Sequence, residues 1–202
     1  MPGRLSITSP IAELAAACGV ATPDLPDWQP NDDAAPGGPL PVLITGESGP
    51  LIVDMRWGII PVGRVNARGR PVMETVINAR SETVFDKTAF DGVRRAVVPV
   101  NGWFEWTGKV RRKTRWRITN PAQPIMFFAA IYDVWTAPGG REVPQVATLT
   151  AEPNGDVKAY HHRMPVILDA PGPWLDLPDE PARTLLSPAP DGTVMVVEAP
   201  ER

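Results

Sequence analysis

The sequence has 202 residues, of which 43% are apolar and 21% charged, as is usual for a globular domain with its own core. It contains neither an apolar run of the roughly 18 residues that a membrane-spanning helix needs nor the start of a secretory signal. One cysteine, Cys18, excludes an internal disulfide, and two histidines are too few for an ordinary structural zinc site. We therefore expect a single cytoplasmic domain over residues 1–202, a monomer without cofactor, metal or membrane partner.

The net charge of −3 conceals a strong segregation of charge along the chain. Residues 56–117 hold fourteen Lys and Arg against five Asp and Glu, a balance of +9, whereas residues 1–55 and 118–202 each come to −6. A basic segment of this kind either follows a phosphate backbone or forms a solvated face. Charge alone does not decide between these two interpretations.

In chain order, the first predicted element is a short helix from Ile11 to Cys18, with Ser9 as its cap, Pro10 at its first position and Gly19 at its exit. Cys18 is expected to be a small core residue rather than a reactive one. Strand-like runs lie at residues 42–44, 51–60, 96–106, 114–118, 125–135, 143–150 and 193–197. Further helical stretches are expected at residues 84–94, 156–161 and 174–186, and the 25 prolines limit long helices.

This balance predicts an α+β fold. We expect a single β-rich domain with a curved, mainly antiparallel sheet or barrel-like core and a few short helices.

Four stretches carry a resemblance to a known family. They read Met-Pro-Gly-Arg at residues 1–4, Trp-Gly-Ile-Ile-Pro at 57–61 with Asn-Ala-Arg-Ser-Glu-Thr at 78–83, Pro-Val-Asn-Gly-Trp-Phe-Glu-Trp at 99–106, and His-His-Arg-Met-Pro at 161–165. In order and spacing they resemble the SOS response-associated peptidase (SRAP) family. Any one would be a weak match, but four in the right order are specific.

The resemblance implies a function and a set of site residues. Family members bind single-stranded DNA at abasic sites, where the amine and thiol of an N-terminal cysteine close a thiazolidine ring with the sugar aldehyde. By the same resemblance, Asn78 positions the terminal amine, Glu105 serves acid and base steps, and His161 protonates the sugar oxygen. The residues expected to contact DNA phosphates are Arg4, Arg80 and Arg163, with Thr150 beside them.

The chemistry of these residue types supports such roles. Opening a closed sugar requires a proton donor at the ring oxygen, and histidine titrates near neutral pH. An attacking amine must lose a proton, and the apolar neighbours of Glu105 should raise its pKa toward a useful range. The alternatives are non-catalytic roles: Glu105 faces solvent, His161 is structural, and Asn78 is a turn residue. Trp103 and Trp106 fit the core as well as they fit a stacking platform for bases.

Pro2 stands where the family has its cysteine, so no thiol is available to close a thiazolidine. Removal of Met1 would expose a secondary amine at Pro2, which can attack an aldehyde and form an iminium ion. Our main hypothesis is therefore an imine-forming lyase. A catalytically silent DNA-binding relative is the second hypothesis and a peptidase the third, and an engineered or misread position 2 is a further alternative.

Other departures concern DNA contacts more than the fold. Residues 62–64 lack the tryptophan that is common in the family, and Asp33 replaces an expected amide. His162 stands where an acid or amide is usual, and the chain ends soon after Glu198. A basic run is expected to extend the DNA surface or to form a hairpin beside it; it consists of Lys109, Arg111, Arg112, Lys113, Arg115 and Arg117.

Overall fold

Five strands close into a barrel in the computed structural model, which describes residues 2–60, 75–87, 90–109 and 112–200. In ring order they are β10 (Glu142–Ala151), β4 (Gly49–Trp57), β3 (Pro39–Gly46), β6 (Arg94–Val100) and β9 (Met126–Thr136), which returns to β10. Every pairing in the ring is antiparallel except that of β10 with β4. The expected β-rich α+β fold with a barrel-like core is confirmed.

Short strands extend the barrel beside β10 and β9. β5 (Asn78–Arg80) runs parallel to β10, β11 (Met164–Pro165) runs antiparallel to it, and β12 (Ile167–Leu168) pairs with β9. Strand β10 therefore lies between the segment that carries Asn78 and the segment that follows His161.

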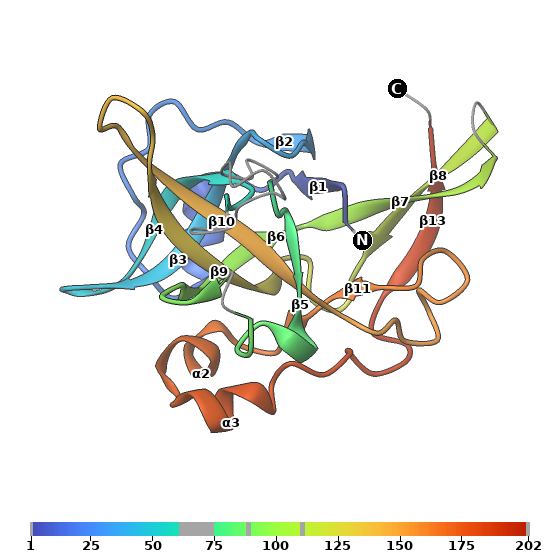
Figure 1. The fold of residues 1–202 in the computed structure, drawn as a ribbon. Coiled ribbons are helices and arrows are strands. Elements are labelled where there is room, and N and C mark those ends of the chain that lie inside the picture. The colour runs from blue at the N-terminus through green and yellow to red at the C-terminus, as the bar shows by residue number, and fades with distance from the viewer. Residues whose placement is uncertain (1, 61–74, 88–89, 110–111, 201–202) are drawn as a thin grey trace.

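A second, five-stranded sheet is formed by the remaining strands. Its order is β13 (Met195–Ala199), β8 (Arg112–Thr119), β7 (Gly102–Lys109), β1 (Arg4–Ile7) and β2 (Asn31–Ala34). The β7–β8 hairpin projects away from the barrel (Figure 1). The hairpin expected from the basic run is thus present in the described residues, while Arg111 lies outside them.

The single strand expected at residues 96–106 is in fact two strands, because the chain changes sheet at Asn101. The Asn101 carboxamide accepts hydrogen bonds from the backbone N–H of Thr8 at 2.7 Å and of Ser9 at 2.9 Å. A side chain at Gly102 would meet the carbonyl oxygen of Ile118 at 2.6 Å, so this corner favours glycine. The corner binds the start of the chain to the junction between the two sheets.

Helices are short throughout the described residues, and several differ from expectation. They are α1 (Ile11–Ala17), the 3-10 turn η1 (Ser81–Thr83), α2 (Pro171–Asp176) and α3 (Asp179–Arg183). Ser9 does not cap α1, because Pro10 occupies the cap position and Asn101 binds the hydroxyl of Ser9. The stretch expected as one helix at 174–186 is split between α2 and α3, with Pro178 at the start of α3.

Two helix predictions were wrong. The described part of residues 84–94 forms turns before β6, where Gly92 has a φ of 77° and the ring of Phe85 packs edge-on against Trp174. Residues 156–161 form successive turns rather than an α-helix. Asn154 starts these turns by accepting hydrogen bonds from the backbone of Val157 and Lys158.

Large aromatic side chains fill the core. Trp103 from the second sheet meets Phe128 of the barrel edge-on, with ring centroids 5.6 Å apart. Trp174 is fully buried and donates its indole N–H to the carbonyl of Ala96 at 2.9 Å, which holds α2 against the barrel. In the described part of the chain, no helix combines the length and the apolar character needed to cross a membrane.

Two carboxylates of β2 form ion pairs with three arginines of the second sheet. Asp33 binds Arg115 at 2.7 Å and Arg4 at 3.2 Å, and Asp32 lies 3.1 Å from Arg117. The Arg115 guanidinium also lies 3.6 Å from the ring centroid of Phe104. Part of the charge of the basic middle third is therefore balanced inside the fold.

We predict that Asp33→Ala lowers the free energy of unfolding by about 2 kcal/mol, because it leaves the buried Arg115 without its carboxylate. Denaturant unfolding measures the loss, with the exposed Asp27→Ala as control. Equal stability of the two variants would contradict the assigned pairing.

Candidate functional site

The start of the chain is held against the middle of the second sheet. In the antiparallel pairing of β1 with β7, Arg4 lies opposite Phe104 and Leu5 opposite Trp103. Continuing this register brings the residues before Arg4 alongside Glu105. Pro2 is buried, and the Asn78 side-chain amide donates a hydrogen bond to its carbonyl oxygen at 2.8 Å.

Thr148 determines which way the Asn78 side chain points. The parallel register of β5 and β10 places Thr148 opposite Asn78, and the Thr148 hydroxyl donates to Asn78 Oδ1. Because Oδ1 accepts this bond, the NH₂ group is the one that faces Pro2. The resemblance led us to expect contact between Asn78 and the terminal amine, whereas the observed bond is to the carbonyl of Pro2.

Sequence reasoning missed Thr148. A signal for it was present, since Thr148 and Thr150 alternate along an apolar strand and must share one side of it.

Glu105 is a buried carboxyl group, 3% exposed, in strand β7. Burial raises the pKa of Glu105 to about 7, opposed by the positive charge of the amino terminus and by the Trp103 indole N–H. This direction is the one expected from its apolar neighbours. A carboxyl group with such a pKa is present in both protonation states at neutral pH and can serve as acid or base.

His161 is half-buried and fixed by the backbone that follows it. His161 Nδ1 lies 3.0 Å from the backbone nitrogen and 3.1 Å from the carbonyl oxygen of Arg163, so the Arg163 backbone holds this side of the ring. Burial, followed by the charge of the amino terminus, lowers the pKa of His161 to about 4. The ring is therefore neutral at pH 7, in contrast to the titration near neutrality expected from its residue type.

The amino terminus is the feature that Glu105 and His161 share. Its positive charge lowers the pKa of both groups. Together with the Asn78 bond to Pro2, this effect indicates that the start of the chain lies near Glu105 and His161.

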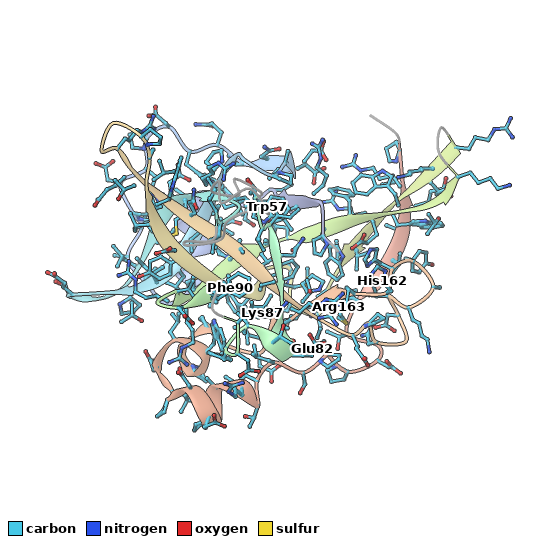
Figure 2. The ribbon with its side chains drawn as sticks, viewed as in Figure 1. Trp57, Glu82, Lys87, Phe90, His162 and Arg163 are labelled. Atoms are coloured by element: carbon cyan, nitrogen blue, oxygen red, sulfur yellow. The ribbon has the colours of Figure 1, made fainter. Side chains whose placement is uncertain are left out.

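Arg163 forms an ion pair at the edge of this site, in which the arginine side chain is 9% exposed and the Glu82 side chain 46% exposed. As a whole residue, Arg163 is only 8% exposed, and its guanidinium binds both carboxylate oxygens of Glu82 at 2.6 and 2.7 Å. Both side chains are labelled in Figure 2. The same guanidinium donates to the carbonyl of Thr150, which is itself fully buried. For Arg163 to bind a phosphate, its pair with Glu82 would have to open or be shared.

The other two expected phosphate contacts are more accessible. Arg80 is exposed at the end of β5, opposite Thr150 on β10. The Arg4 side chain is 41% exposed but pairs with Asp33. The phosphate-contacting roles of all four residues remain predictions.

Within the described ranges, no three His, Cys, Asp or Glu side chains are arranged to hold a metal ion. A cavity of about 480 Å³ lies elsewhere, lined among others by Phe85, Arg94, Tyr132 and Leu175. It contains none of the four expected catalytic residues. Residues 62–64, at the position of the family's missing tryptophan, lie outside the described residues.

Comparison with known proteins identifies the family. A family model described as SOS response associated peptidase (SRAP) matches residues 1–201. The chain belongs to the SRAP family.

Relatives with this domain carry one common description. The chain is 31% identical over 157 residues to the Bacillus subtilis abasic site processing protein YoaM, a match that covers 74% of this chain and 67% of YoaM. It is 27% identical over 227 residues to the abasic site processing protein HMCES of Gallus gallus, covering 91% of this chain and 68% of HMCES. A match to the B. subtilis abasic site processing protein YoqW is 29% identical and covers 70% of this chain and 64% of YoqW. In each of these three relatives, about a third of the length lies outside the match.

Solved structures share the SRAP fold. A protein from Bacteroides thetaiotaomicron superimposes with a TM-score of 0.81 at 23% identity, covering 97% of this chain and 91% of the other. A protein from Bordetella bronchiseptica gives the same TM-score at 21% identity and full coverage of both chains.

The raised pKa of Glu105 predicts how stability depends on pH. The folded protein retains the Glu105 proton up to about pH 7, whereas the ordinary value is 4.5. The folded state therefore binds more protons between these values, and this group lowers the free energy of unfolding as the pH rises through that window. Relative to the unsubstituted protein, Glu105→Gln should gain up to roughly 3 kcal/mol at pH 8 and nothing at pH 4.

Denaturant unfolding at the two pH values measures this difference, with the exposed Glu47→Gln as control. A gain of equal size at both pH values would show that the ionisation of Glu105 is not its cause.

Proposed function

We propose that this chain processes abasic sites in single-stranded DNA and engages the sugar aldehyde through the amine of Pro2 after loss of Met1. The observation that carries the proposal is the Asn78 hydrogen bond to Pro2, the residue next to the amino-terminal charge of residue 1 that lowers the pKa of Glu105 and of His161. Membership of a family whose relatives are named abasic site processing proteins supports a role at such lesions.

The first step is opening of the closed sugar to its aldehyde. The bond between C1′ and the ring oxygen breaks as that oxygen receives a proton. The resemblance assigns this proton to His161. At pH 7, however, a group with a pKa near 4 is protonated in roughly one molecule per thousand, whereas about half of the Glu105 carboxyls are protonated. Protonated Glu105 is therefore the more abundant acid, with His161 as a hydrogen-bond donor beside it.

The second step forms the covalent bond. The Pro2 nitrogen attacks C1′ and passes its proton to the Glu105 carboxylate, which returns it when the C1′ hydroxyl leaves as water. The product is an iminium ion. An N-terminal amine titrates at roughly 7.7–8.0, so a useful fraction is unprotonated at neutral pH.

The absence of a thiol decides the fate of this intermediate. A cysteine would close a ring on the iminium carbon, whereas Pro2 cannot. The iminium either hydrolyses back or loses a proton from C2′, after which the C3′–oxygen bond breaks and the 3′ phosphate leaves. The second route cuts the strand, and hydrolysis then releases the protein.

Of the alternatives, a silent DNA-binding relative keeps the same site without chemistry. A peptidase needs a nucleophile, and the cysteine of the chain is unsuited because burial raises the pKa of the Cys18 thiol to about 12. Cys18 also lies at the end of α1, within the core.

Borohydride trapping tests the proposal, because hydride reduces the iminium carbon and makes the link permanent. Protein whose Pro2 terminus is verified by intact mass should give an adduct with abasic single-stranded DNA only when borohydride is present. Glu105→Gln should slow trapping by about 10²-fold, as is usual for loss of a general acid–base group. Pro2→Cys should give an adduct that no longer requires the reductant.

The controls distinguish the lyase hypothesis from the hypothesis of a catalytically silent DNA-binding protein. A protein with residues added before Pro2 should bind DNA but give no adduct. If protein with a verified Pro2 terminus binds abasic DNA but is never trapped, the lyase proposal is wrong. The protein is then a catalytically silent DNA-binding relative. Failure to bind single-stranded DNA at all would overturn both.

A further inference from the structure

The two faces of the β7–β8 hairpin differ in whether their arginines are paired with carboxylates. Its pairing runs without a break from Trp103 opposite Ile118 to Lys109 opposite Arg112. Alternate residues of a strand point to opposite faces, so Arg112, Thr114 and Trp116 share one face of β8. Lys113, Arg115 and Arg117 share the other.

On the face of Arg115 and Arg117, carboxylates of the protein itself balance the charge of both arginines. These arginines pair with Asp33 and Asp32 of β2, as described above. Lys113, exposed near the tip, is the remaining cation of β8 on this side. An approaching phosphate therefore meets two arginines whose charges are already balanced by carboxylates.

The opposite face begins at the candidate site. Trp116 lies directly across from Glu105. Its indole N–H donates to the Thr107 hydroxyl at 2.7 Å, and its ring meets Tyr160 edge-on with centroids 4.8 Å apart. Tyr160 immediately precedes His161, so this aromatic pair joins the hairpin to the segment that carries the imidazole.

Farther out on this face, Thr114 and Arg112 follow at two-residue intervals. Arg112 is exposed, and among the residues that the structure describes no carboxylate pairs with it. The four residue-to-residue steps from Trp116 to Arg112 span about 13 Å of strand. Stacked nucleotides advance about 3.4 Å each along one strand, so that span corresponds to about four of them.

We propose that Trp116, Thr114 and Arg112, here called the arm face, bind the nucleotides that flank the lesion on one side of the single strand. Trp116 and Tyr160 offer a stacking surface beside the site, and Arg112 contacts a phosphate about four nucleotides away. This inference rests on the proposed function only in placing the lesion at Glu105.

A pair of adjacent residues gives a matched test. Arg112→Ala and Lys113→Ala each remove one exposed cation from the same tip, but from opposite faces. Binding is measured by fluorescence anisotropy on single-stranded DNA with a central tetrahydrofuran abasic analogue, which has no aldehyde and therefore isolates binding from chemistry. One probe has eight nucleotides on each side, and two others have either the 5′ or the 3′ flank cut to two nucleotides.

On the long probe, Arg112→Ala should weaken binding about threefold at 0.15 M salt and reduce the slope of log K against log salt by about 0.7. Lys113→Ala should change neither quantity. With one of the two shortened probes, and only one, the difference between Arg112→Ala and the unsubstituted protein should vanish.

Equal effects of the two substitutions would overturn the arm face. So would an effect of Arg112→Ala that persists on both shortened probes. Failure of the proposed chemistry is seen separately, because borohydride trapping of a true abasic site does not enter these binding measurements.

Discussion

The hydrogen bond from Asn78 to the Pro2 carbonyl fixes where the chain begins, and the chemistry of the site depends on that position. A chain terminus is ordinarily free to move, and an amine on a mobile terminus would have no defined partner. Here Thr148 fixes the Asn78 amide, Asn78 holds Pro2, and the pairing of β1 with β7 carries the chain past Glu105. These contacts join segments that are far apart in the sequence, and together they hold Pro2 in a buried position.

Strand β10 brings the separate motifs together. Through its parallel pairing with β5 it places Thr148 beside Asn78, and through β11 it places Ala151 and Thr150 beside Met164 and Pro165. The Arg163–Glu82 ion pair also joins the segment that follows His161 to the segment that follows β5. Motifs far apart in the sequence therefore meet because one central strand pairs with both of their segments.

The electrostatics of the site limit the charge that has to be buried. Burial favours the neutral form of Glu105 and the neutral form of His161, so the amino terminus is the main charge among the three groups near neutral pH. A neutral imidazole and a half-protonated carboxyl group leave a proton donor and a proton acceptor available at once. In the second sheet, Asp32 and Asp33 pair with Arg4, Arg115 and Arg117, so the two arginines of β8 on the face away from Glu105 already have carboxylate partners.

The sequence predicted the fold class and singled out the candidate site residues, but it did not show how these residues are held. Asn78, Glu105 and His161 stood in ordered motifs, and alternating apolar patterns located most strands. Thr148 lay in no motif, and its role depends on a strand pairing that spans 70 residues of chain. The helix expected after Val84 failed because Phe85 packs on Trp174, a tertiary contact that overrides local propensity. Likewise the local charge count could not reveal that Asp32 and Asp33, far away in the sequence, neutralise Arg115 and Arg117.

The central claim is that the amine of the mature amino terminus lies beside the Glu105 carboxylate. A titration of protein carrying ¹³C-labelled proline, followed by NMR at Pro2, measures the pKa of that amine directly. If the account is right, the pKa falls in Glu105→Gln, because the ammonium form loses a nearby negative charge. An amine pKa that is the same with and without the carboxylate would contradict it.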